Sequence, residues 1–300
     1  MTARPVDWII AVYNVVLLGV WLPLVPSDGT ARWLAGVHLV ALAVPVLLAR
    51  TGERAGRLGR AARTLYPLLL LMVFWRELGV HCGLVGSAAN DLAITTWERS
   101  LFGGVLSSVW MPAMPRLWFS ETMEAFYFSY YVFLLAVPAW SLVRGDRASR
   151  EDVVLRVALA YTACFLLYAV APTAGPMFMF PRYVGENAHG LFRTVNDFLR
   201  ETGDAAGTAF PSSHVAGIVT LAWVAWRHLP RPVAFAATVS ALGVAPATVY
   251  TQNHFVLDAI VGAAIGVGLQ LAVAPVLAWL GAPRRTGTRG LMPASEPEAA

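Results

Sequence analysis

Eight long apolar segments constrain this 300-residue chain more than any other feature. A helix that crosses a bilayer needs about 20 predominantly apolar residues, because lipid offers no partners for backbone polar groups. Hydrophobic residues make up 57% of the chain and charged residues 13%, which argues against a soluble domain. The sequence therefore predicts an all-α, polytopic membrane helical bundle, with about eight transmembrane helices near 8–26, 31–49, 64–82, 117–142, 153–173, 211–228, 233–250 and 254–280.

The arginines indicate how this bundle faces the membrane. All 22 basic residues are arginines, and most lie near the N-terminus or in the connections after the second, fourth, sixth and eighth segments. Cytoplasmic loops are enriched in positive charge, so we expect both termini in the cytoplasm and an integral protein of a bacterial plasma membrane. The formal net charge of +4 follows from this loop pattern, and we predict no nucleic-acid partner from it.

Two histidine motifs lie at the two ends of a predicted helical hairpin. Pro211-Ser212-Ser213-His214 opens the sixth apolar segment, and His254 opens the eighth, 40 residues after His214. The chain between them is long enough to cross the bilayer twice. Both histidines are therefore predicted to emerge on the same face of the membrane, the extracytoplasmic one.

The neighbours of the two histidines suggest complementary roles. Asp258 lies four residues after His254, on the same helix face, where a carboxylate can hold one imidazole nitrogen and leave the other as a nucleophile. The helix that begins near His254 adds a field that favours an anion. Ser212, Ser213 and the backbone amides of their helix start can hold an anion, and His214 can protonate a leaving oxygen. Each motif alone is explained more simply as a surface hydrogen bond or a polar helix cap. Together, they suit in-line phosphoryl transfer.

These residues resemble the type 2 phosphatidic acid phosphatase superfamily over about residues 90–275. That family has a Pro-Ser-Gly-His motif and a later motif that ends in His-x3-Asp. The resemblance implies that His254 is a nucleophile forming a phosphohistidine, that Asp258 orients it, and that His214 is the general acid. It implies that Ser212 and the Ser213 backbone bind phosphate. The substrate would be a membrane phospholipid or pyrophospholipid, with no metal or other cofactor.

The chain also departs from the family pattern. Ala247-Thr248 stands where the family has Ser-Arg, and a lysine of another family motif has no counterpart because the chain contains no lysine. Thr248-Val249-Tyr250 and Gly190-Leu191-Phe192-Arg193 resemble the branch related to inositol phosphorylceramide synthases. Arg193 is therefore the first candidate for binding phosphate and Arg182 the second, with a plain contact to lipid headgroups as the alternative for each.

The chain divides into three predicted parts. Residues 1–63 form two accessory transmembrane helices and a basic cytoplasmic loop, residues 64–281 form a six-helix catalytic domain, and residues 282–300 form a disordered cytoplasmic tail. Two outer connections are too long for simple turns. We expect amphipathic or re-entrant pieces in 83–116, and a cover over the site in 174–210.

Several other polar residues are assigned structural roles. His38, alone in an apolar segment, is expected to be packed and hydrogen-bonded. Glu121 and Glu124 are expected to join an ion-pair network, with the holding of a hydroxyl acceptor as the alternative. His81 and Cys82 lack further ligands nearby, so no metal site is predicted.

The same chemistry serves two reactions. Water would resolve the intermediate in a phosphatase, and a lipid or polyol hydroxyl would resolve it in a phosphotransferase such as the headgroup transferases of the branch above. A different class remains open as well, a non-catalytic lipid-binding or transport protein whose polar residues line a path. The sequence predicts no particular oligomeric state.

Overall fold

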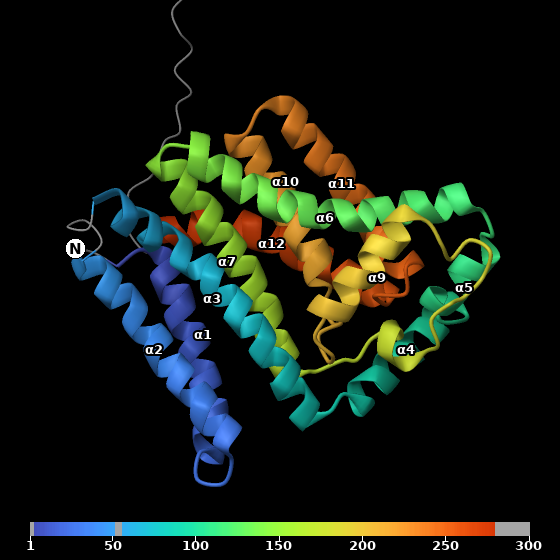
Figure 1. The fold of residues 1–300 in the computed structure, drawn as a ribbon, viewed down its shortest axis with the longest axis horizontal. Coiled ribbons are helices and arrows are strands. Elements are labelled where there is room, and N and C mark those ends of the chain that lie inside the picture. The colour runs from blue at the N-terminus through green and yellow to red at the C-terminus, as the bar shows by residue number, and fades with distance from the viewer. Residues whose placement is uncertain (1–2, 52–55, 280–300) are drawn as a thin grey trace, which may run out of the picture.

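The structure is a computed structural model, and it describes residues 3–51 and 56–279. These residues are almost entirely helical, with one isolated bridge between Thr173 and Thr208, which confirms the predicted all-α fold (Figure 1). The elements are α1 (Pro5–Trp21), a 3-10 turn (Leu22–Leu24), α2 (Gly29–Thr51), α3 (Gly56–Val85), α4 (Ala88–Phe102), α5 (Leu106–Ala113), α6 (Leu117–Arg144), α7 (Arg147–Val170), α8 (Pro176–Met179), α9 (Leu191–Gly203), α10 (Ser213–His228), α11 (Arg231–Tyr250) and α12 (Val256–Trp279). The predicted tail at 282–300 lies outside the described residues.

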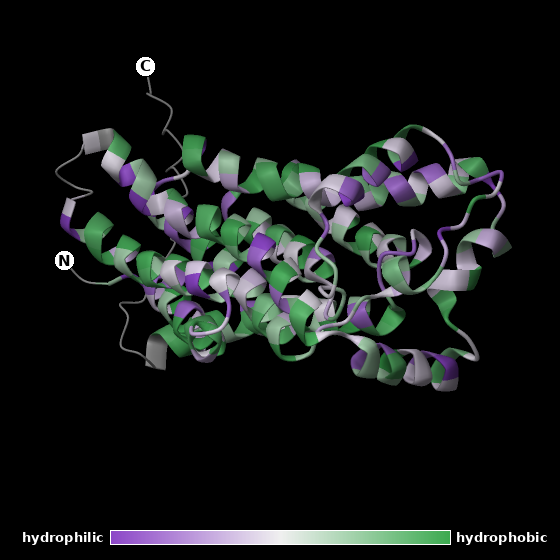
Figure 2. Cartoon of the chain, turned by 60° about the horizontal axis from the view of Figure 1, so that its bottom comes forward, coloured by the Kyte–Doolittle hydropathy of each residue, from purple (hydrophilic) through white to green (hydrophobic). Residues whose placement is uncertain are grey.

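Seven helices in the described ranges are long and apolar enough to cross a membrane, namely α1, α2, α3, α6, α7, α11 and α12. Hydrophobic residues cover much of these helices in Figure 2. The remaining predicted segment, at 211–228, corresponds to α10, which has only 16 residues. It is shorter than predicted because Pro211 and Ser212 precede the helix, and Ser212 caps it. α10 packs among α6, α7, α11 and α12.

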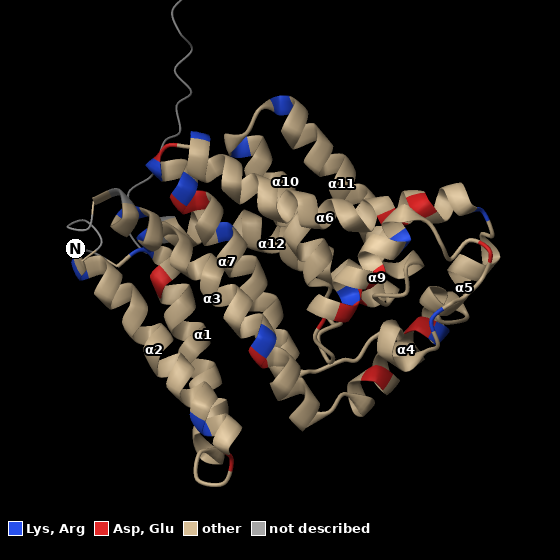
Figure 3. Cartoon of the chain, viewed as in Figure 1, with Lys and Arg blue, Asp and Glu red and all other residues tan. Residues whose placement is uncertain are grey.

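The two ends of the bundle differ in chemistry. At one end, Arg63 of α3 pairs with Asp7 of α1. At the same end Asp152 of α7 accepts hydrogen bonds from Arg227 and from His228 of α10, at 3.2 and 2.7 Å. Figure 3 shows the charged connection between α6 and α7 on this side of the molecule. α4, α5, α8 and α9 gather at the opposite end (Figure 1). They lie in the two connections that the sequence marks as too long for turns.

A buried polar cluster joins α1 and α2 to α3. The Nδ1 of His38 lies 2.8 Å from Oδ1 of Asn14, and its Nε2 lies 2.7 Å from Oε1 of Glu77. Trp21 also donates to Glu77. His38 is fully buried, so the prediction of a packed, hydrogen-bonded histidine is confirmed. Because each of these groups would be costly in hydrocarbon without a partner, the cluster fixes how α1 and α2 dock.

Candidate active site

The two predicted histidines contact each other directly. Nε2 of His254 lies 3.4 Å from Nδ1 of His214, and the ring centroids are 5.5 Å apart. His214 stands in the first turn of α10, and His254 stands just before α12. The helical hairpin of α10 and α11 therefore returns the chain to the end where it started, as the spacing of the motifs predicts. Both side chains line one small cavity of about 30 Å³.

Asp258 contacts the ring nitrogen of His254 that does not face His214. Its Oδ2 lies 3.4 Å from Nδ1 of His254 and accepts the backbone N–H of Phe255 at 2.8 Å. The Asp258 side chain is completely buried. This contact leaves Nε2 of His254 directed toward His214, in the lining of the cavity.

A tyrosine on α6 contacts the ring nitrogen of His214 that does not face His254. The hydroxyl of Tyr127 lies 3.1 Å from Nε2 of His214, and that of Tyr131 lies 3.4 Å from it. With Asp258 ionised and both imidazoles neutral, one arrangement of protons satisfies every contact from Tyr127 to Asp258. Tyr127 donates to His214, Nδ1–H of His214 donates to Nε2 of His254, and Nδ1–H of His254 donates to ionised Asp258. Tyr127 is absent from the sequence prediction, because the aromatic stretch of α6 is better explained by helix packing.

The predicted phosphate-binding serines also serve the local fold. The Ser212 side chain accepts the N–H of Val215 at 3.3 Å, which caps α10. The Ser213 N–H donates to the hydroxyl of Tyr168 at 3.1 Å, and that hydroxyl donates to the Pro211 carbonyl at 2.7 Å. These bonds fix the turn that carries His214.

The N-terminus of α12 already holds a carboxyl group of the protein. The Glu98 side chain, from α4, accepts the N–H groups of Val256 and Leu257, the latter at 3.4 Å. Burial raises the pKa of Glu98, and these two N–H groups partly offset that rise. The sequence analysis expects the field of this helix start to favour an anion, and the carboxyl group of Glu98 occupies that position.

A second carboxylate of α4 holds the loop between α7 and α8, which lines another part of the cavity. Asp91 accepts the N–H groups of Ala174 and Gly175 at 3.2 and 3.3 Å. Ala174 lines the cavity beside the histidines. α4 thus positions two segments of the site through side chains that the sequence analysis did not single out.

The two predicted arginines belong to one cluster on and near α9. Arg193 bonds Asp197 at 2.6 Å and Glu124 of α6 at 3.5 Å. Arg182 bonds Asp197 at 3.0 Å and the carbonyl oxygen of Thr251 at 2.8 Å. Glu124 therefore joins an ion-pair network, as predicted. Glu121 instead accepts the backbone N–H groups of Phe192 and Arg193, at the start of α9.

Arg200 is a third member of the cluster that sequence reasoning missed. It bonds Asp197 at 2.6 Å and Glu124 at 2.9 Å, and its guanidinium lies 5.2 Å from the centre of the Tyr127 ring. The contact with Tyr127 makes Arg200 the arginine most directly connected to His214. Burial, with repulsion from Arg200 and Arg193, lowers the pKa of Arg182 to about 10. Asp197 and Glu124 balance two of the three arginine charges, and the charge that remains favours an additional anion.

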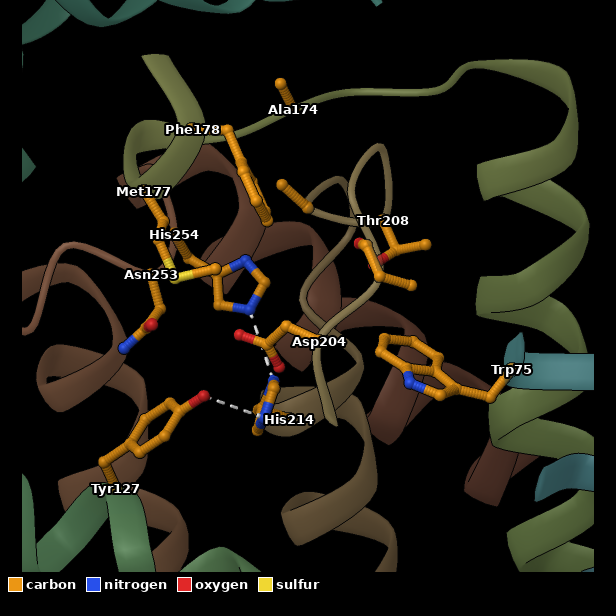
Figure 4. A pocket seen from close by; sticks show the side chains of 12 residues that line it. Trp75, Tyr127, Ala174, Met177, Phe178, Asp204, Thr208, His214, Asn253 and His254 are labelled. Carbon is orange, nitrogen blue, oxygen red and sulfur yellow. Dashed lines mark hydrogen bonds between the residues drawn. The ribbon is translucent and has the colours of Figure 1, made fainter. Parts of the chain in front are cut away.

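The remaining wall of the cavity contains an unpredicted acid. Asp204, just after α9, lies beside the contact between the two imidazoles (Figure 4). Trp75, Met177 and Phe178 form an apolar rim of the same cavity. Within residues 3–51 and 56–279, no three His, Cys, Asp or Glu side chains are arranged to hold a metal ion.

A comparison with protein families matches residues 92–272 to the PAP2 superfamily. The matched region extends from α4 into α12 and contains both histidines, Asp258 and the arginine cluster. Comparisons with curated proteins and with solved structures gave no match. The family match leaves α1, α2 and α3 outside it and agrees with the resemblance drawn from the histidine motifs.

Proposed function

This chain belongs to the PAP2 superfamily, and from that premise we propose that it is a membrane enzyme that cleaves or transfers the phosphate group of a lipid through a phosphohistidine on His254. One observation carries the proposal. His254 presents Nε2 to Nδ1 of His214 in the lining of a shared cavity, while Asp258 holds Nδ1 of His254. This is the arrangement of nucleophile, acid and orienting carboxylate that phosphoryl transfer requires.

In the first half of the reaction, Nε2 of His254 attacks phosphorus. The N–P bond forms as the bond from phosphorus to the leaving oxygen breaks. That oxygen takes a proton from the doubly protonated form of His214, which is left neutral. The imidazole nitrogens, 3.4 Å apart, leave no room for a phosphorus atom between them. Substrate binding must therefore part the two rings or enter beside their contact.

In the second half, the oxygen of water or of an alcohol attacks phosphorus. The N–P bond breaks, its electron pair returns to Nε2 of His254, and His214 accepts the proton of the attacking hydroxyl. Water gives a phosphatase and an alcohol gives a phosphotransferase. Because the protein groups act identically in both, the acceptor that reaches the cavity decides the product.

In this mechanism, the arginine cluster supplies positive charge that stabilises the phosphate oxygens. Arg200 and Arg182 are the members best placed for this role, because Arg200 stacks on Tyr127 and Arg182 bonds the Thr251 carbonyl, three residues before His254. Arg193 bonds Asp197 and Glu124 and supports the other two. This order differs from the one drawn from sequence, where Arg193 comes first.

Headgroup transfer, as in the branch related to inositol phosphorylceramide synthases, is the more specific version of this proposal. Thr248 occupies the place of the missing family arginine, and its carbonyl accepts the backbone N–H groups of Asn253 and His254, each at 3.0 Å. The Thr-x-Tyr stretch thus supports the nucleophile through the backbone. The end of the bundle that carries Arg63, Arg227 and the charged connection between α6 and α7 lies opposite the histidines. By the positive-inside rule, this supports an extracytoplasmic site.

The test is product analysis with purified protein. Phospho- and pyrophospholipids are supplied with and without lipid or polyol acceptors, and products are identified by mass spectrometry. We expect an acid-labile phosphoenzyme and turnover in the wild type and neither in His254→Ala. His228→Ala, at the opposite end of α10, is the matched control and should retain both. Free phosphate would identify hydrolysis, and an exchanged headgroup would identify transfer. Activity that survives His254→Ala would refute the mechanism and favour a transport role.

A further inference from the structure

Asp204 is an acid placed where a phosphate would have to bind. It lies just after α9, ten residues before His214, and lines the small cavity together with both histidines. Figure 4 shows its carboxylate beside the contact between the two imidazoles. In the described part of the chain, no residue donates a hydrogen bond to either of its side-chain oxygens. A negative charge there would oppose a phosphate group.

The charged and titratable groups around Asp204 come from every wall of the site. Burial raises the pKa of Asp204 to about 6, and the charges of Arg200, His254 and Arg182 partly offset that rise. The remaining groups are His214, across the cavity, and two tyrosines of α6, Tyr127 and Tyr131, on which Asp204 also acts electrostatically.

The nearby arginines do not cancel the repulsion between a charged Asp204 and a phosphate group. Asp197 accepts hydrogen bonds from Arg182, Arg193 and Arg200, and Glu124 pairs with the last two. Much of their positive charge is therefore already balanced. A phosphate in the cavity meets the Asp204 carboxyl at close range, and a carboxylate offers it no donor.

We propose that Asp204 binds a proton when a phosphate group enters the cavity, and that its carboxyl O–H then donates a hydrogen bond to a phosphate oxygen. The inference rests on the proposed function, since it assumes that the cavity receives the phosphate. It makes Asp204 a substrate-binding residue and couples binding to the uptake of one proton. The same coupling would release that proton when the phosphorylated ligand leaves.

The coupling predicts a specific pH dependence. At pH 7 only about one Asp204 in ten is protonated before binding, and at pH 8 about one in a hundred. Phosphate affinity should therefore fall about tenfold for each pH unit above roughly 7 and should level off below roughly 5. In Asp204→Asn the side-chain amide donates at every pH, so the variant should bind more tightly than the wild type at pH 8, by up to about 100-fold.

The experiment compares wild type, Asp204→Asn and Asp204→Ala between pH 5 and 9. Orthophosphate is the probe, and its affinity is measured by calorimetry in buffers of different ionisation enthalpy, which also counts protons. Titration of orthophosphate and of the histidines affects all three proteins, so the affinity ratio of wild type to Asp204→Asn isolates this carboxyl. Above about pH 7 we expect that ratio to fall about tenfold per pH unit, with about one more proton taken up by the wild type. Glu201→Gln, which removes an exposed acid of the preceding helix α9, should match the wild type.

The outcomes separate this inference from the proposed function. A ratio that does not change with pH, in proteins that still turn over lipid phosphate through His254, overturns the role of Asp204 and leaves the enzyme intact. Proton-linked orthophosphate binding without turnover or phosphoenzyme overturns the proposed chemistry and leaves this role standing. Asp204→Ala removes the negative charge without supplying a hydrogen-bond donor, so it separates loss of repulsion from hydrogen bonding to the phosphate. If it matches Asp204→Asn at pH 8, removal of the negative charge explains the effect and the O–H donor is refuted.

Discussion

Gly262 sets the distance between the two helices that carry the catalytic candidates. It lies on α12, one turn after Asp258, where the helix crosses the start of α10. A Cβ added at Gly262 would lie 2.4 Å from the Ser212 carbonyl oxygen and 3.3 Å from the Ser212 carbonyl carbon and Cβ. The Ser212 N–H donates to the Asp258 carbonyl at 2.9 Å, so this crossing is part of the site.

The size of the clash sets the expected effect of Gly262→Ala. Ordinary contacts of a Cβ begin at 3.4 Å, so the new methyl group is 1.0 Å too close to a backbone atom that no rotamer change can move. The two helices must part by about that distance. Overpacking of this kind costs about 1–3 kcal/mol in the free energy of unfolding. A displacement of about 1 Å between reacting groups lowers turnover by about 100-fold.

Gly268→Ala is the matched control on the same helix. A Cβ at Gly268 has no atom within 4 Å, so the substitution should leave turnover unchanged and stabilise α12 by up to about 1 kcal/mol. Unfolding in mixed micelles measures stability, and lipid-phosphate turnover measures the site. Equal stability and equal turnover in the two variants would refute the reasoning. A loss of stability without a loss of turnover would show that this crossing does not control the distance between His214 and His254.

Three further predictions follow from single contacts of the site. Tyr127→Phe removes the donor to Nε2 of His214, and we expect turnover to fall about tenfold and its pH profile to shift while the melting temperature stays nearly unchanged; an unaltered pH profile would contradict this. Burial alone would raise the pKa of Asp197, but bonds from Arg193 and Arg200 outweigh it and lower the pKa, so the stability from these bonds should be full above about pH 4 and lost as pH falls through the lower folded value. Asp197→Asn should lose that acid-dependent part of the unfolding curve. Glu98→Ala should destabilise the protein by about 1–3 kcal/mol because two N–H groups of α12 lose their acceptor, and Glu98→Gln, whose amide oxygen still accepts, should recover most of the loss in the same unfolding assay.

The fold and the meeting of the two histidines were predictable because both depend on patterns local in sequence. The length of the apolar segments requires membrane helices, and an even number of crossings between His214 and His254 returns the chain to one face. The position of Asp258 four residues after His254 fixes their shared helix face. The length of α10 was overestimated, because apolar content does not reveal that a serine cap starts the helix two residues into the predicted segment.

The support around the histidines was not predictable from such patterns. Glu98 bonds a backbone amide 158 residues later in the chain, and no local periodicity marks that contact. Tyr127 is one of several aromatic residues on α6, and only the packing of α6 against α10 selects it. The arginine cluster left a readable signal, since Arg193, Asn196, Asp197 and Arg200 recur at helical spacing and form one face of α9. That spacing could have identified Arg200 before the structure did.

The charges around the histidine pair are divided between two sides, and this division gives the proposed reaction a direction. Asp258 and Glu98 lie on the α12 side of His254, where the contact of Asp258 with Nδ1 of His254 can stabilise the positive charge that develops on the ring as the N–P bond forms. Arg200 and Arg182 lie on the α9 side, where positive charge stabilises the phosphate oxygens. Because Glu98 occupies the amides at the start of α12, the helix field acts on a carboxylate of the protein and not on the substrate. On the proposed mechanism the phosphate therefore approaches from the α9 side, where Asp204 also lies.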